Sequence, residues 1–145
     1  MTRRLNSDRG SIMPLTVFFG FLSLALILVV VAATSLYLER KRLFTLADGA
    51  ALVGAEAFAI DSVTVTPSGP RPTLQAADVT AAVTAYLAGI PDPGFDSLKV
   101  DRATTDDGSS ATVTLSAVWH PPVLAALLPE GVRIDVTSTA RSVFG

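Results

Sequence analysis

His120 is the only histidine of the chain, and its imidazole is the side chain best suited to acid–base chemistry near neutral pH. It stands between Trp119 and the pair Pro121-Pro122. A Ser-His-Asp site would require a serine and an aspartate to meet it in space, and no serine here has the nucleophile-elbow pattern. We therefore predict a histidine at the surface or rim of the fold, no catalytic residues, and a protein that is not an enzyme.

Asp101, Asp106 and Asp107 form the other group with possible chemistry, because carboxylate oxygens are the ligands that calcium prefers. Their spacing differs from that of an EF-hand, and Asp106-Asp107-Gly108 is ordinary turn chemistry. The sequence has no zinc motif, no phosphate-binding glycine loop and no cysteine, which excludes disulfides and thiolate sites. We expect no metal, no cofactor and no small-molecule substrate.

A basic cluster, Arg40, Lys41 and Arg42, follows directly on a long stretch without charge. Long basic side chains at such a position commonly contact lipid headgroups at the membrane boundary. Docking of a partner protein is the alternative. We interpret the three residues as membrane-boundary charges.

The uncharged stretch runs from Gly10 to Leu38 and is predominantly apolar. About 20 apolar residues in a helix cross a hydrocarbon core roughly 30 Å thick. A soluble chain of 145 residues could hardly surround so long an apolar helix with protein. We predict a transmembrane helix at residues 12–38 that continues, without a break, as a helical extension at 39–60.

The direction and processing of the membrane span are less strongly encoded. Basic residues lie at both ends of the span, but a short basic tail at residues 1–11 is typical of a signal-anchor. We therefore expect a cytoplasmic N-terminus and an extracytoplasmic C-terminal domain. Cleavage after Ala33, cleavage after Gly10 and no cleavage all stay open.

The helical extension has a broad apolar side made of small residues. Ala47, Ala51 and Ala55 are spaced by four, and Gly54 runs beside them. Small residues at this spacing allow another helix to approach closely. The alternative is that they pack on the chain's own sheet. We call Ala47, Ala51, Gly54 and Ala55 the predicted contact face.

Residues 61–145 are predicted to form a small α+β head. A proline-rich loop at 61–72 precedes a helix over 74–88 that Thr73 would cap. Period-two alternation predicts an antiparallel sheet of about three strands, at 98–103, 112–119 and from 132 toward 144, with a turn at 106–109. Residues 121–128 have room for two helical turns. The helices should cover one face of the sheet.

Charge is divided between the two parts of the chain. Residues 1–60 carry six Arg or Lys and four Asp or Glu, whereas residues 61–145 carry five and nine. An acidic head argues against a nucleic-acid surface, so we expect no nucleic-acid partner.

One combination of features resembles a known family. Arg9-Gly10-Ser11, the apolar span, the segment from Tyr37 to Leu43 and the alanine-rich run around Asp48 resemble the N-terminal region of the TadE/TadG-like proteins of Flp (Tad) pilus assembly. The resemblance covers roughly Arg9 to Ala59. Leu15 stands where processed TadE-type minor pilins carry a glutamate, which favours a TadG-like, uncleaved member.

The resemblance implies a bacterial, single-pass, pilin-like structural or assembly component of a Tad pilus or related secretion system. Its partners would be membrane lipid and other pilus or secretion-system subunits, bound through helix packing. The alternative is a solitary membrane-anchored domain that binds an extracytoplasmic ligand.

Overall fold

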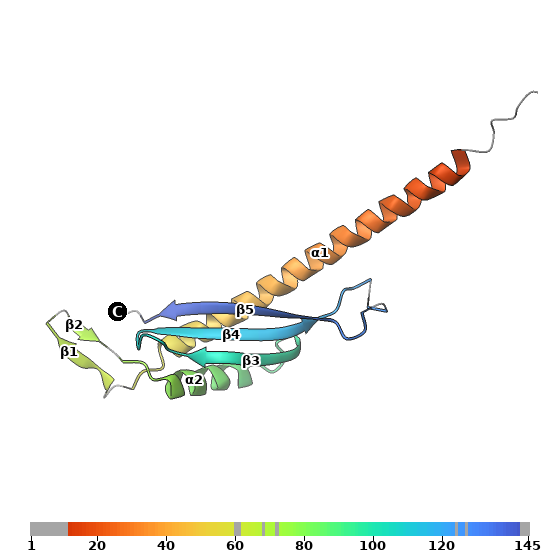
Figure 1. The fold of residues 1–145 in the computed structure, drawn as a ribbon. Helices are drawn as coiled ribbons and strands as arrows, with labels where there is room; N and C mark the ends of the chain where they lie inside the picture. The colour runs from red at the N-terminus through yellow and green to blue at the C-terminus, as the bar shows by residue number, and fades with distance from the viewer. Residues whose placement is uncertain are drawn as a thin grey trace, which may run out of the picture.

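The protein consists of a long helix and a small α+β head packed against the C-terminal half of that helix (Figure 1). The computed structural model describes residues 12–59, 62–67, 69–71, 73–123, 125–126 and 128–142. The elements are, in chain order, α1 (Ile12–Ala55), β1 (Thr64–Thr66), β2 (Gly69–Arg71), α2 (Ala76–Ala88), β3 (Asp96–Thr104), β4 (Ser110–Trp119) and β5 (Val132–Arg141). The predicted fold class, with its long N-terminal helix, second helix and three-stranded antiparallel sheet, is confirmed.

Helix α1 is continuous over 44 residues. Pro14 lies in its first turn, where a missing N–H leaves no hydrogen bond unmade. The helix ends at Ala55 and not near Ile60 as predicted, because the chain tightens into a shorter turn: the N–H of Ala57 donates to Gly54 O at 3.3 Å. Phe58 then packs against the edge of the core.

The main sheet has the order β3-β4-β5, with both pairs antiparallel. Strands β4 and β5 pair without interruption from Ser110↔Arg141 to Trp119↔Val132. The β3–β4 pairing shifts register between Asp96 and Lys99, where Ser97 has a φ of 50°. The regular alternation of β4 and β5 is what gives this sheet one apolar and one polar face.

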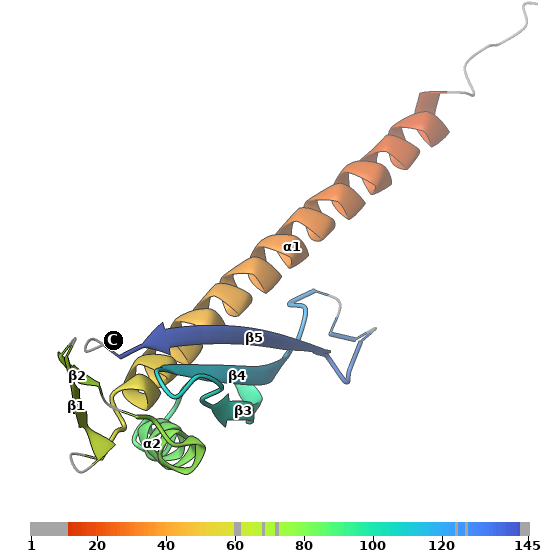
Figure 2. The ribbon, with the colours of Figure 1, turned by 60° about the vertical axis from the view of Figure 1, so that its left-hand side comes forward.

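Both helices lie on the same face of the sheet (Figure 2). The opposite face carries threonine pairs that are direct cross-strand neighbours. Thr112 and Thr139 hydroxyls are 3.1 Å apart, and those of Thr114 and Thr137 are 2.9 Å apart. These hydrogen-bonded pairs support the β4–β5 register on the side without helices.

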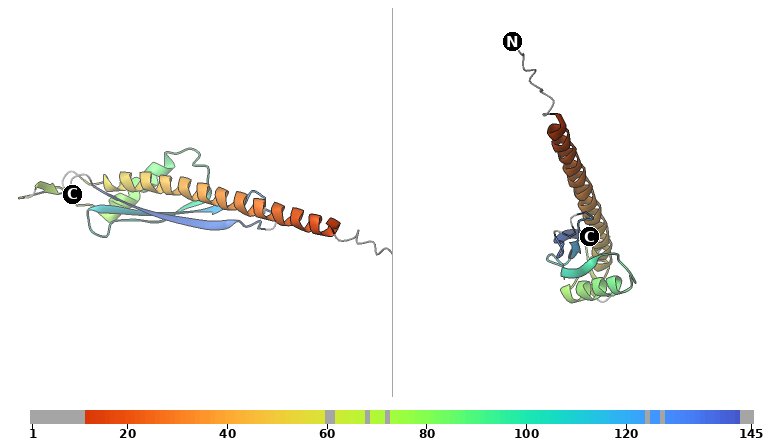
Figure 3. Two further views of the ribbon diagram at one scale, coloured as in Figure 1. Left: turned by 90° about the horizontal axis from the view of Figure 1, so that it is seen from above. Right: turned by 90° about the vertical axis from the view of Figure 1, so that its right-hand side faces the viewer.

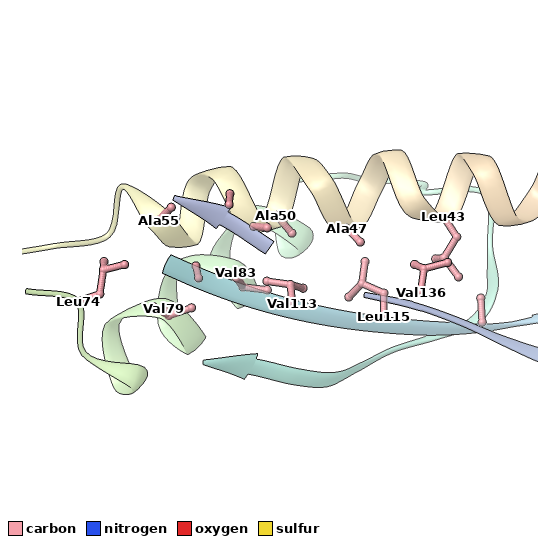
Figure 4. Close-up of a cluster of buried hydrophobic side chains, with 14 of the residues drawn as sticks. Leu43, Ala47, Ala50, Ala55, Leu74, Val79, Val83, Val113, Leu115 and Val136 are labelled. Carbon is pink, nitrogen blue, oxygen red and sulfur yellow. The ribbon is translucent and has the colours of Figure 1, made fainter. Parts of the chain in front are cut away.

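The core lies between α1, α2 and the helix-covered face of the sheet (Figure 4). Alanines on α1 bring the helix backbone close to Val113 and Leu115 of β4, while α2 contributes Val79 and Val83. Burying a side chain of the size of valine or leucine contributes about 1.5–3 kcal/mol. The C-terminal half of α1 is therefore part of the core of the head.

Helix α2 begins later than predicted. It starts at Ala76, with Gln75 at the N-cap position and no side-chain cap. Thr73 does not cap the helix, because Leu74 turns into the core and its N–H donates to Gly108 O at 2.8 Å. Burial of the Leu74 side chain outweighs the preference of Thr73 for the N-cap position.

Two loop predictions also differ from the structure. The proline-rich segment contains a two-stranded ribbon, β1–β2, paired from Thr64↔Arg71 to Thr66↔Gly69. In 121–128 the described residues form turns and no helix. The predicted basic tail at residues 1–11 lies outside the described residues.

Candidate functional site

The N-terminal half of α1 stands clear of the head (Figure 3). Its large apolar side chains are exposed, from 42% for Val31 to 80% for Met13, except for Leu28, which is half-buried. Among the described residues, α1 is the one helix long and apolar enough to cross a membrane. From Ile12 to Val31 the exposed stretch has about 20 residues, which at 1.5 Å each matches a hydrocarbon core of about 30 Å.

Two hydroxyl groups within the apolar helix bond back to its own backbone. Thr16 Oγ1 donates to Ile12 O at 2.9 Å, and Thr34 Oγ1 donates to Val30 O at 2.8 Å. A polar group in hydrocarbon is costly unless it has such a partner. These threonines are therefore compatible with an apolar medium.

The head first touches α1 at the C-terminal limit of this exposed stretch. Trp119 Nε1, at the end of β4, donates a hydrogen bond to Ser35 Oγ at 3.2 Å. Ala33, Leu36 and Tyr37 also lie beside β5. The head thus begins before Leu38, the predicted end of the span, so a membrane-spanning segment free of the head is shorter than residues 12–38.

The three basic residues 40–42 point in different directions, because successive helix residues are rotated by about 100°. Arg42 forms an ion pair with Glu39 at 3.3 Å and lies 5.4 Å from the ring centroid of Phe95. Arg40 faces β5 beside Asp135. Arg42 therefore helps to hold the head against α1. The basic cluster in the sequence did not indicate this role.

A groove runs between α1 and the edge strand β5. It consists of two adjoining hollows, of about 430 and 330 Å³, which share Tyr37 and Arg40. We call it the α1–β5 groove. Its lining is formed by Ala33, Leu36, Tyr37, Arg40, Lys41 and Phe44 of α1 and by residues 133–137 of β5.

Two features of this groove suit a protein partner. Phe44 and Tyr37 remain 47% and 66% exposed beside it. Strand β5 pairs with β4 on one side and is the outer strand of its sheet on the other. An edge strand of ten residues offers backbone N–H and C=O groups to an added segment.

The predicted contact face occupies a different place. Ala47 and Ala51 are 0% exposed, Ala55 is 1% exposed, and Gly54 is buried as well. All four pack inside the head. This is the arrangement given above as the alternative to contact with another helix, in which the small residues pack on the chain's own sheet. A Cβ on Gly54 would lie 3.1 Å from both Val79 Cγ1 and Ala111 Cβ. Contact with a second molecule through this face would require the core to open.

Asp48 joins α1 to the sheet in a way that spacing did not predict. Ser138 Oγ, on β5 and 5% exposed, donates to Asp48 Oδ1 at 3.0 Å. The next residue, Gly49, lies against Tyr86 of α2, whose hydroxyl is 2.7 Å from where a Cβ would be. The Asp-Gly pair in the alanine-rich run thus positions both the sheet and α2 on α1.

The residues first considered for chemistry have structural partners. His120 is at the surface, as predicted, and its Nδ1 lies 3.2 Å from Asp96 Oδ2. Asp106 pairs with Arg102 at 2.7 Å. Asp107 accepts hydrogen bonds from Ser110 Oγ at 2.7 Å and from the N–H groups of Ser109 and Ser110, and these bonds lower its pKa below the ordinary value. Within the described residues, no three His, Asp or Glu side chains are grouped as metal ligands.

The comparison with known proteins concerns the N-terminal segment that contains α1. Residues 10–57 match the family model described as putative Flp pilus-assembly TadE/G-like. The N-terminal segment is TadE/G-like. The match confirms the resemblance inferred from sequence, and its residues include all of α1. No curated protein and no solved structure is significantly similar to the chain. The TadE/G-like segment thus combines the exposed apolar stretch, the residues lining the helix side of the groove, and Asp48.

Proposed function

We propose that this protein is a single-pass membrane-anchored structural or assembly component of a Tad/Flp-type pilus or related secretion system. It acts by association and not by catalysis. The observation that carries the proposal is the exposed apolar half of α1 within a TadE/G-like segment. A helix surface of this size and composition requires either lipid or other apolar helices around it.

In this proposal the bilayer surrounds the helix from Ile12 to about Ala32, the N-terminus is cytoplasmic, and the head is extracytoplasmic. Arg40, Lys41 and Arg42 then lie two to three helical turns beyond the hydrocarbon, from where their long side chains can reach back toward the lipid headgroups. Support comes from the point at which the head begins, at Ser35.

Association with other subunits has two candidate surfaces on the folded chain. Within the bilayer, Gly20 has no neighbouring atom within 4 Å of a Cβ position, so a second helix could approach closely there. Outside the bilayer, the α1–β5 groove combines exposed aromatic side chains with a strand edge. Neither surface needs the core to open, in contrast to the predicted contact face.

The proposal is tested by recovery of the full chain from its native membranes. After cell breakage without detergent it should sediment with membranes, and mild-detergent extracts should contain it bound to other single-span subunits. Tyr37→Ala and Phe44→Ala should reduce this co-purification. Leu52→Ala is the matched control, because Leu52 is 51% exposed on the same helix but outside the groove.

Each contrary result has a separate meaning. A monomeric chain in the detergent-free supernatant contradicts the anchor itself. Unchanged co-purification of both groove variants contradicts the groove as the contact. A membrane-bound wild type recovered alone supports the solitary ligand-binding domain, for which the same groove, with an apolar lining and Arg40, is the site of choice.

A further inference from the structure

Residues 120–131 connect β4 to β5, and those that the structure describes, 120–123, 125–126 and 128–131, project from the sheet toward the N-terminal part of α1 (Figures 1 and 2). From Pro121 to Pro129 its sequence has no charged residue and is mostly apolar. Val123 and Leu128 are 48% and 45% exposed. The head therefore presents apolar side chains at its end nearest the exposed half of α1.

The position of this connection relative to the helix follows from one hydrogen bond. Trp119, immediately before the connection, is bonded to Ser35, which lies close to the C-terminal limit of the proposed span. The connection continues beyond Trp119 in the direction of that stretch. If the exposed stretch lies in the bilayer, the connection reaches the bilayer surface.

We propose that the β4–β5 connection inserts into the interfacial region of the same bilayer that α1 crosses. This inference rests on the membrane anchor of the proposed function and adds a second lipid contact, made by the head. Its ligand is the lipid surface itself. The head is then held at the membrane by α1 and by this connection.

The composition of the connection suits the interface. Tryptophan is enriched at the level of lipid headgroups, where its ring is apolar and its N–H finds a polar partner, as Trp119 does. Charged groups flank the apolar run: Glu130 follows it, and the His120–Asp96 pair precedes it. Because charges stay out of hydrocarbon, these groups limit insertion to the interface.

The base of the connection is tightly built, so that its direction is determined by the fold. Gly131 has a φ of 67°, a conformation that favours glycine. A Cβ there would lie 2.6 Å from Val118 Cγ1 and 2.8 Å from Trp119 O. Strand β5 therefore starts directly against the end of β4, and the apolar run is presented from a rigid edge of the sheet.

The test uses the natural absence of cysteine. Val123→Cys and Leu128→Cys are made in the full chain, labelled with an environment-sensitive fluorophore, and reconstituted into phosphatidylcholine–phosphatidylglycerol nanodiscs. Nitroxide lipids that are spin-labelled near the headgroup quench fluorophores at the interface, and lipids that are spin-labelled deep in the acyl chain quench a fluorophore at position 22, in the middle of the span. Val65→Cys on the distal ribbon and Val100→Cys on β3 are exposed apolar controls, at 88% and 40% exposure, and Leu22→Cys reports on the span. Circular dichroism confirms that each variant is folded.

The inference expects loss of emission at positions 123, 128 and 22, and unchanged emission at 65 and 100. If position 22 is quenched while 123 and 128 behave like 65, the head contact is contradicted and the anchor stands. If position 22 is not quenched, the membrane anchor fails and the head contact fails with it. Equal quenching at all head positions would show that the head lies on the bilayer without a preferred contact, which also overturns the inference.

Discussion

The indole N–H of Trp119 on β4 donates to the hydroxyl of Ser35 on α1 across 3.2 Å. The two residues are 84 positions apart in the sequence. Their contact joins the end of the sheet to the helix at the level where the helix surface changes from exposed to packed. It therefore marks where the head ends and the candidate membrane span begins.

Ser35→Ala should loosen this end of the head. Loss of the acceptor removes a neutral hydrogen bond, for which we expect a fall of about 1 kcal/mol in the free energy of unfolding of the head. Urea titration of the solubilised full chain, followed by the emission of Trp119, the only tryptophan, measures it. Ser23→Ala, in the exposed half of α1, is the control and should leave the midpoint unchanged; an equal loss in both variants would contradict the role of the contact.

Asp48→Ala should destabilise the head through a different bond. It leaves the buried hydroxyl of Ser138 without its acceptor, and we expect a loss of about 1–3 kcal/mol. Asp48→Asn keeps an acceptor oxygen of nearly the same shape and should lose less. Thermal unfolding followed by circular dichroism ranks the two variants, and a loss as large for asparagine as for alanine would assign the effect to the charge and not to the hydrogen bond.

Gly54→Leu and Gly20→Leu should separate folding from assembly. A leucine at position 54 must displace Val79, Val83 and Ala111, so overpacking should cost about 1–3 kcal/mol or more and disrupt the head. At position 20 nothing lies within 4 Å, and head stability should not change. Proteolytic resistance of the head and co-purification of partners are the two measurements. Loss of partners in Gly20→Leu with an intact head supports helix packing in the bilayer, whereas a head that tolerates Gly54→Leu would contradict the described core.

Asp107→Asn should change how head stability depends on pH. Because the serine hydrogen bonds lower the pKa of Asp107 in the folded state, its contribution is complete above the ordinary carboxyl pKa of about 3.9 and is lost as pH falls below it. The difference in midpoint between wild type and variant should therefore be constant near neutral pH and shrink below about pH 4. Asp101→Asn, on β3, is the charge-matched control. A difference that grows with acidity would have the wrong sign.

Much of the fold was predictable because it is encoded locally. The uncharged stretch before Arg40 indicates a long helix by itself, and the alternation around Val113 and Val136 indicates strands by its period of two. The segment resemblance likewise depended on contiguous residues, and the family match covers the same helix.

The surfaces were less predictable, because they depend on residues distant in sequence. An alanine stripe such as Ala47-Ala51-Ala55 has the same pattern whether it meets a partner helix or its own sheet. The α1–β5 groove exists only because residues near 40 and near 135 come together. A signal for the Asp48–Ser138 bond was present, since one aspartate interrupts an alanine-rich run, but its partner could be found only in three dimensions.

Helix α1 passes from the exposed stretch into the core of the head without a hinge. A rotation of the anchor about its own axis must therefore turn the sheet through the same angle, and a tilt of the anchor must tilt the sheet equally. A partner that rotates the helix therefore also changes the orientation of β5.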